Sequence, residues 1–385
     1  MKRVGGRRGA RKASIDVSTA EARQAALVFD PSRLTTAREL REMSQVELAR
    51  TVTGLTAASI SQFERGHTNP SAATLQKVSA ALGVPVQFFQ RRSHATAPVP
   101  DPYFRSLRST SAADRRRSRA LAGLVHEFVA EIENHVTLPD LDLPDLAGPS
   151  GVDEHAGFEM FETLAARARG HLGVLPGPVG NVVQHIERAG VVTARLRVGA
   201  DKIDAFSVPY RDRPVVILGS DKGLRDRSRF DAAHELGHLL LHRPDQAGTR
   251  LAENQAHRFA AAFLLPRTEI EPLLPTRPDW RVLLELKQTW HVSLGALLHR
   301  AKSLGVMSEQ TYVQALKVMS ARGWRKNEPA DLGPPESPLL LPAAVRATAS
   351  QGVTVEELAQ RAGLPLAEVL RLLEPSLDPR PRVVF

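Results

Sequence analysis

Residues 228–242 read Ser-Arg-Phe-Asp-Ala-Ala-His-Glu-Leu-Gly-His-Leu-Leu-Leu-His, with the pattern His-Glu-x-x-His at His234, Glu235 and His238. Side chains four residues apart lie on one face of an α-helix, so both imidazoles can reach a single metal ion. Glu235 points to the neighbouring side, where its carboxylate can accept a proton from an attacking water. We therefore predict a helix over residues 227–242 that carries a metal-dependent hydrolytic centre, with His234 and His238 as ligands and Glu235 as the catalytic base.

A catalytic zinc ion needs a third protein ligand and an open fourth position. The chain has no cysteine, so this ligand must be a carboxylate or a histidine. His242 lies about 12 Å along the helix from His234, too far to share one ion, and we expect it to support the ligands or cap the helix. Glu253 opens the next predicted helix, over 251–265, and a helical hairpin would bring it over the histidine face. We predict Glu253 as the third ligand of one Zn²⁺ per chain; the alternatives are a solvated helix-start carboxylate there, or Glu269 and Glu271 as ligands.

The surrounding sequence mixes helical and strand patterns. Helical periodicity over 158–170 and 178–189 is followed by short β patterns at 191–196, 205–208 and 214–218. Three further helical patterns lie between residues 227 and 322. The prediction is an α+β domain of zincin type over 158–326, with a small sheet beside the helices of the site.

The first 90 residues carry a different pattern. Ser44 is a good helix N-cap with a glutamate, Glu47, three residues on, Gly54 breaks this helix, and Thr56 caps a second short one. Two short helices joined by a glycine turn form the geometry that places a recognition helix in the major groove. We predict an all-α helix-turn-helix domain over 31–90.

The positive charge of the chain is concentrated beside that domain. The formal net charge is +9, yet residues 1–12 and residues 91–119 each carry a net +6. Basic segments on both sides of a helix-turn-helix are suited to contacts with DNA phosphates, most clearly for 91–119. A solubilising tail and a flexible linker are the alternative interpretation.

The composition limits the class of protein. A chain of 385 residues with 42% hydrophobic residues indicates two or three globular domains. No apolar run reaches the ~18 residues of a membrane-spanning helix, and no apolar segment follows the basic N-terminus, so we expect no membrane partner and a cytoplasmic location.

The remaining segments complete the predicted organisation. Residues 354–373 repeat the helix-turn-helix pattern with apolar residues at the reading positions, which favours a packing or dimer element over a second DNA reader. The predicted parts are a disordered basic arm (1–30), the helix-turn-helix domain (31–90), a basic linker with a connecting helix (91–157), the zincin-like domain (158–326), a Pro-rich linker (327–342) and a helical C-terminal element (343–374).

Residues 33–90 resemble the XRE-family, lambda-repressor-like helix-turn-helix, through Ser44-Gln45, Leu48-Ala49, Glu64-Arg65-Gly66 and Asn69-Pro70-Ser71. The resemblance implies binding to an operator in double-stranded DNA and an ion pair between Arg38 and Glu64. Gln45 would contact a phosphate. Thr56 begins the recognition helix, whose reading positions are Ala57, Ala58, Ser61 and Gln62. Because such domains usually read paired half-sites, a homodimer is expected.

Residues 228–242 together with 253–266 resemble the ImmA/IrrE family of zinc metallopeptidases, and the resemblance covers about 160–326. It implies zinc held by His234, His238 and Glu253, with Glu235 as the base, and cleavage of XRE-type repressors under stress or induction. His257 departs from the family pattern, which usually has Asn or Asp there. We expect His257 either to orient His234 or to perturb the site.

Two functions follow from these patterns. The first is a DNA-binding transcriptional regulator whose zinc endopeptidase domain hydrolyses a peptide bond in a regulatory protein, an XRE-type repressor or a protein of its own type, on a stress or induction signal. The second is a transcription factor whose metallopeptidase-like domain is a sensor with little or no turnover, because a motif does not prove cleavage.

Overall fold

The computed structural model describes residues 19–90, 111–148, 151–196, 204–210, 212–219, 223–246, 248–325 and 327–373, and residues 103–104 by their backbone. The chain divides into two compact units. Unit 1 consists of residues 1–99, 111–135 and 347–371, and unit 2 consists of residues 100–110, 136–346 and 372–385. Each unit combines segments that are distant in the sequence.

Unit 1 is a helical bundle built around the predicted helix-turn-helix. It contains α2 (Pro31–Leu40), α3 (Gln45–Thr51), α4 (Ala57–Glu64), α5 (Ala72–Leu82) and the short η1 (Val86–Phe89). Ser44 and Glu47 form the capping box of α3, and Thr56 caps α4, as the sequence predicts. Gly54 has φ of +90°, the left-handed conformation that the turn between α3 and α4 requires.

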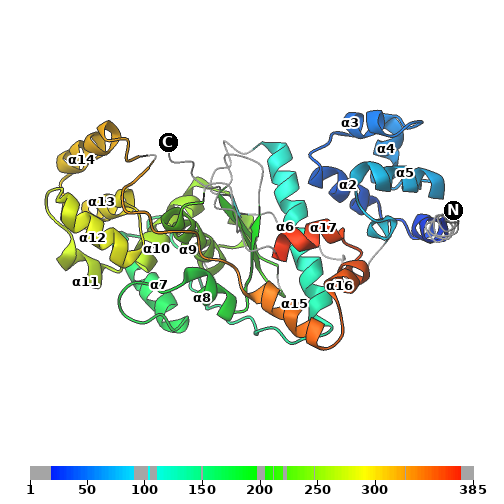
Figure 1. The fold of residues 1–385 in the computed structure, drawn as a ribbon. Helices are drawn as coiled ribbons and strands as arrows, with labels where there is room; N and C mark the ends of the chain where they lie inside the picture. The colour runs from blue at the N-terminus through cyan, green and yellow to red at the C-terminus, as the bar shows by residue number, and fades with distance from the viewer. Residues whose placement is uncertain are drawn as a thin grey trace, which may run out of the picture. The chain divides into compact units, whose positions relative to one another are not determined.

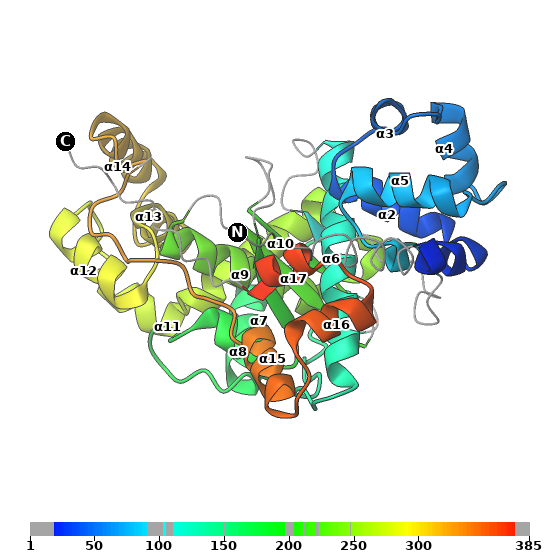
Figure 2. The same ribbon diagram turned by 45° about the vertical axis from the view of Figure 1, so that its right-hand side comes forward.

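Helix α6 (Ala112–Glu133) and the C-terminal helices α16 (Val355–Ala362) and α17 (Leu366–Leu373) extend this bundle. Helix α6 packs against α2 and α16, so elements from both sides of unit 2 in the sequence meet here (Figure 2). Arg41, at the end of α2, pairs with Glu368 of α17 at 2.6 Å. The C-terminal repeat of the helix-turn-helix pattern therefore serves as a packing element within unit 1.

Two predicted boundaries differ from the structure. The prediction of a disordered arm over 1–30 is wrong for its second part: residues 19–27 are helical, with Ala22 and Ala25 fully buried, and residues 1–18 lie outside the described part. Alanine is small, so the sequence gives no strong signal that these two side chains are buried. The prediction of a linker continuing to residue 157 is also wrong, because Leu138 and Leu146 are buried in unit 2.

Unit 2 contains a small mixed sheet with strand order β1-β3-β4-β2. Its strands are β1 (Tyr103–Phe104), β2 (Val192–Leu196), β3 (Ala205–Val208) and β4 (Val215–Gly219). Strand β4 is parallel to β2 and antiparallel to β3, and Ser207 on β3 lies opposite Val216 on β4. The last three strands coincide with the predicted ones to within a residue, because all are short apolar runs bounded by turns.

Helices cover this sheet in layers. Helix α9 (Arg225–Leu241) packs on β3 and β4, α10 (Arg250–Leu264) packs on α9, and α7 (Phe158–His171) packs on α10 (Figure 1). Helix α8 (Val182–Arg188) lies against β2 and α9. The remaining helical elements of the unit are η2 (Pro244–Gln246), α11 (Arg267–Ile270), η3 (Glu271–Leu273), α12 (Trp280–Trp290), α13 (Leu294–Ser303), α14 (Glu309–Ala321) and the first part of α15 (Leu340–Ser350). Residues 347–350 of α15 belong to unit 1.

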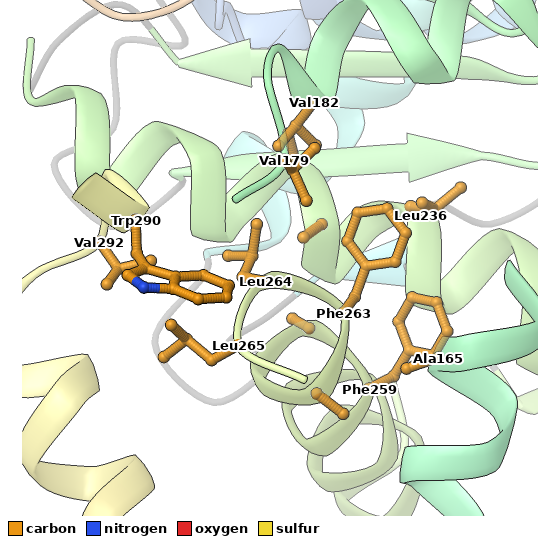
Figure 3. Close-up of a cluster of buried hydrophobic side chains, with 14 of the residues drawn as sticks. Ala165, Val179, Val182, Leu236, Phe259, Phe263, Leu264, Leu265, Trp290 and Val292 are labelled. Atoms are coloured by element: carbon orange, nitrogen blue, oxygen red, sulfur yellow. The ribbon is translucent and has the colours of Figure 1, made fainter. Parts of the chain in front are cut away.

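The core of unit 2 joins these layers. Phe259 and Phe263 of α10 stack at 5.8 Å between ring centroids and lie with Leu236 of α9 in one apolar cluster (Figure 3). Trp290 and Val292 belong to the same cluster and extend it to α12 and α13. This packing fixes α9 and α10 side by side, and these are the two helices that carry the predicted metal ligands.

The predicted Pro-rich linker over 327–342 is a fixed part of unit 2 instead of a free spacer. Glu328 accepts hydrogen bonds from Lys287 and from the backbone N–H of Leu294. Glu336 is buried and forms an ion pair with Arg229 of α9, which is itself 2% exposed. The proline-rich composition indicates irregular backbone, and this is observed. The sequence did not indicate the buried partners of the two glutamates, because these come from elements far away in the sequence.

The predicted fold class is confirmed: a helix-turn-helix is followed by an α+β domain with a small sheet and by a helical C-terminal element. Within the described ranges, no helix combines the length and the apolar character needed to cross a bilayer.

Candidate metal centre and DNA-binding helix

Helices α9 and α10 bring the three predicted metal ligands together. His234 and His238 lie one turn apart on α9, and Glu253 lies in the first turn of α10. The Nε2 atoms of the two histidines are 3.1 Å apart. Glu253 places Oε2 3.2 Å from Nε2 of His234 and Oε1 3.2 Å from Nε2 of His238. In the described part of the chain, these three form the group able to hold a metal ion.

The separations fit a zinc ion. Ligands about 2.0–2.1 Å from a tetrahedral zinc ion lie about 3.3 Å from one another. In this chain Nε2 of His234 and Nε2 of His238 are 3.1 Å apart, and each lies 3.2 Å from a different oxygen of Glu253. Two imidazoles and one carboxylate are also a donor set that zinc accepts, and they leave a fourth position for a reacting group. The residues therefore fit the ion that the sequence predicts.

Charge in this cluster is arranged to favour an ionised carboxylate. Burial alone would raise the pKa of Glu253, but hydrogen bonds from His234 and His238 lower it to about 2. The carboxylate is consequently negative at neutral pH, the state in which it can bind a cation. The side chain of Glu253 is 16% exposed, whereas those of His234 and His238 are almost completely buried.

A buried hydrogen-bonded chain supports His238. Nδ1 of His238 lies 3.0 Å from Nδ1 of His242, and Nε2 of His242 lies 3.0 Å from Oε1 of Gln255. Burial, together with the neighbouring His238, lowers the pKa of His242 to about 3, so this ring is neutral. In one tautomer, His238 donates from Nδ1 to His242 and His242 donates from Nε2 to Gln255, so that Nε2 of His238 is the ring atom turned toward Glu253 and the proposed metal position.

His242 is also the C-cap of α9, and its backbone N–H donates to the carbonyl of His238. The structure thus places His242 in the supporting position that the sequence indicates. Gln255 was not anticipated, since a glutamine on a helix has no signal that relates it to a metal site. Its Nε2 donates in turn to the carbonyl of Asp153 at 3.2 Å, so the supporting chain ends on the backbone.

Glu235 is buried on the side of α9 that faces the sheet. Its side chain accepts a hydrogen bond from Oγ of Ser207 on β3 at 2.6 Å. Ser207 is fully buried. A hydrogen bond of this length fixes the position of one oxygen of the Glu235 side chain. Ser207 is a site residue that the sequence did not reveal, because a serine in an apolar strand resembles an ordinary core position.

Gly237 allows α9 and α10 to approach closely. A Cβ built there would lie 3.0 Å from Cδ1 of Phe259 and 3.3 Å from Cα of Ala256. Gly237→Ala should therefore push the helices apart, cost about 1–3 kcal/mol of stability and weaken metal binding, because Glu253 is carried by α10. Thermal unfolding and zinc titration measure the two effects.

Gly295→Ala is the matched control, since the nearest atom to a Cβ at Gly295 would be Oγ of Ser293, at 3.8 Å. The same gain of one methyl group should leave both zinc affinity and unfolding within about 0.5 kcal/mol of wild type. Equal effects of the two substitutions would contradict the role given to Gly237.

His257 lies one turn after Glu253 on α10, at the wall of a cavity of about 490 Å³. Its ring centroid is 4.9 Å from that of Phe230 and 5.7 Å from that of His299. His257 therefore lies between the cavity and Phe230 of α9, which is one helical turn before His234. A role for His257 in orienting His234 stays a prediction.

In unit 1, the residues predicted to contact DNA lie on α3 and α4. Thr56, Ala58 and Gln62 are exposed, and Ala57 and Ser61 are half-buried. Gln45 donates to Glu64 at 2.8 Å, and the predicted Arg38–Glu64 ion pair is present at 2.6 Å. These contacts hold the start of α3 against the end of α4.

The basic segments are only partly visible. Residues 1–12 and most of residues 91–110 lie outside the described part. On α6, Arg116 pairs with Glu39 at 3.4 Å and Arg117 with Glu42 at 2.6 Å. These two arginines are already neutralised by acids of unit 1, so less of the predicted charge of 91–119 is available to phosphates.

Two parts of the chain match known protein families. Residues 34–89 match a helix-turn-helix family, and residues 186–302 match the family of IrrE N-terminal-like domains, a metallopeptidase family. No curated protein matches the chain significantly. The chain therefore combines a DNA-binding helix-turn-helix domain with a metallopeptidase-like domain that contains the cluster of His234, His238 and Glu253.

Proposed function

We propose that this chain, which joins a helix-turn-helix domain to an IrrE N-terminal-like domain, is a DNA-binding transcriptional regulator with a zinc-dependent endopeptidase. Its substrate would be a regulatory protein, an XRE-type repressor, cut on a stress or induction signal. The observation that carries the proposal is that Nε2 of His234 and Nε2 of His238 lie 3.1 Å apart and each 3.2 Å from an oxygen of Glu253, on the helix whose Glu235 carboxylate is held by Ser207.

The residues of the chain have distinct roles in this proposal. His234, His238 and Glu253 would hold Zn²⁺, which when bound polarises a carbonyl and makes water more acidic. Ser207 orients the Glu235 carboxylate by donating to one of its oxygens. The other oxygen takes a proton from the attacking water and delivers it to the leaving amine, so that Glu235 acts first as base and then as acid.

A second function has a specific observation in its favour. His234, Glu235 and His238 are all 1% exposed or less, so the described residues leave little room for a protein substrate. A metallopeptidase-like domain with such an enclosed centre would suit a sensor that binds metal with little turnover and changes the activity of the DNA-binding unit. The Glu235→Gln experiment in the Discussion separates the two functions.

Exposed polar residues of α4 provide the test of DNA binding. Gln62→Ala removes an exposed amide of the predicted recognition helix and should weaken operator binding by about 1–3 kcal/mol, or 5–150-fold. Wild-type affinity should also fall steeply with salt, because phosphate contacts release counterions. Fluorescence anisotropy with DNA recovered from the purified protein measures both quantities.

Gln360→Ala is the matched control, because Gln360 is an exposed glutamine on α16, in the C-terminal repeat of the pattern. If the C-terminal element only packs within unit 1, this variant should bind DNA like wild type. Affinity that is independent of salt, or that is lowered equally by both substitutions, would argue against α4 as the reading helix.

A further inference from the structure

The edge of the sheet beside Glu235 is covered by a piece of the chain itself. Strand β1 pairs antiparallel with β3, with Tyr103 opposite Ser207 and Phe104 opposite Phe206. Strand β1 is the end strand of the order β1-β3-β4-β2, so without it β3 would be an edge strand. Ser207, opposite Tyr103, is also the residue whose hydroxyl holds the Glu235 carboxylate.

The path of the chain makes this pairing unusual. The segments up to residue 99 and from residue 111 to 135 belong to unit 1, whereas residues 100–110 belong to unit 2. The polypeptide therefore leaves unit 1, contributes a strand to the sheet of unit 2 and returns to unit 1. A connection from η1 to α6, both in unit 1, has no need of a strand in unit 2.

An exposed edge strand is a template for an extended peptide. Its free backbone N–H and C=O groups bind a further strand through main-chain hydrogen bonds, a common mode of peptide recognition. On β3 this template lies beside the position of the proposed base. A peptide bound antiparallel to β3 would run past Ser207, as β1 does, and so past the carboxylate that Ser207 holds.

We propose that the β3 edge is the peptide-binding edge of the catalytic centre and that the chain's own Tyr103–Phe104 strand occupies it at rest. Peptide substrates must then displace this internal strand. The inference rests on the proposed peptidase function. An occupant tethered within the chain has an effective concentration of about millimolar, which allows two paired residues to compete with an incoming peptide.

The test removes the internal strand and measures peptide binding. Tyr103→Pro with Phe104→Pro eliminates both backbone N–H groups of β1, and Glu235→Gln in all proteins prevents cleavage of the probe. The probe is a fluorescent peptide with the sequence of residues 99–108. If β1 occupies the edge about 90% of the time, the double-proline protein should bind the probe about tenfold more tightly than the parent.

The control keeps the strand. Tyr103→Val with Phe104→Val retains both N–H groups and places residues with high β propensity in β1, so it should bind the probe like the parent. Hydrogen exchange provides a readout independent of the probe. The amides of residues 205–208 that face β1 should lose protection in the double-proline protein and regain it when the probe is added.

The outcomes separate this inference from the proposed function. If the double-proline protein neither gains affinity nor loses protection at residues 205–208, β1 does not occupy a peptide-binding edge and the inference is wrong, even if the chain is a peptidase. If both changes appear but the same variant with Glu235 restored does not cut the probe or any repressor, the inference holds and the peptidase function fails.

Discussion

Glu235→Gln should lower the rate of peptide-bond hydrolysis by about 10³-fold while the protein still binds one zinc ion per chain. Gln has nearly the shape of Glu and can still accept the hydrogen bond from Ser207, but it cannot take a proton from water. The three proposed ligands are unchanged. The measurements are zinc content by elemental analysis and cleavage of purified XRE-type repressors, followed by mass spectrometry of the products.

The matched control is Glu285→Gln, at an exposed position on α12 whose contact is an ion pair with Arg281. It should cut repressors at the wild-type rate. If the Glu235→Gln protein cuts as fast as wild type, Glu235 is not the base. If neither wild type nor the Glu235→Gln protein cuts any repressor, and both regulate their promoter equally, the metallopeptidase-like domain is the sensor of the second function.

Glu336→Ala should destabilise unit 2 by about 3–5 kcal/mol, because it leaves the buried guanidinium of Arg229 without its carboxylate. The side chains of Arg229 and Glu336 are 1% and 6% exposed. Burial lowers the pKa of Arg229, and Glu336 opposes this effect by raising it. The guanidinium also donates to the carbonyls of Val179 and Gly180, so it cannot reach water without disrupting α8 and α9.

Chemical unfolding of the full chain, followed by tryptophan fluorescence, measures this loss. Asp331→Asn, in the same irregular segment, is the control, because Asp331 is exposed and accepts from the backbone N–H of Gly333. It should change the free energy of unfolding by less than about 0.5 kcal/mol. Equal stability of the Glu336→Ala and wild-type proteins would mean that residues 327–342 are a spacer after all.

Local patterns predicted the elements of the fold well. The spacing of His234 and His238, the capping pairs of α3 and α4, and the apolar runs of β2, β3 and β4 each depend on residues within one or two helical turns or a single strand. The Arg38–Glu64 pair followed from the family resemblance. These features need no knowledge of how distant segments meet.

Most of the features that escaped prediction depend on distant partners. Ser207 contacts Glu235, Gln255 contacts His242, and Glu336 contacts Arg229, and in each pair the sequence separation hides the contact. The same reason explains why the sequence favoured a packing or dimer role for α16 and α17 without identifying α6 and the end of α2 as the elements that they contact. Tertiary structure decides whether a polar side chain is buried and which group it contacts, so the residue type alone could not identify these partners.

Metal dependence of repressor cleavage is the most direct test of a zinc endopeptidase in this chain. Purified protein is stripped with a chelator, returned to chelator-free buffer and titrated with Zn²⁺ while cleavage of a panel of XRE-type repressors, and of the chain itself, is followed. Cleavage should disappear on stripping and return fully at one equivalent of zinc, but not in Glu253→Ala protein. Cleavage that persists in the stripped protein, or its absence at every zinc concentration, would contradict the proposal.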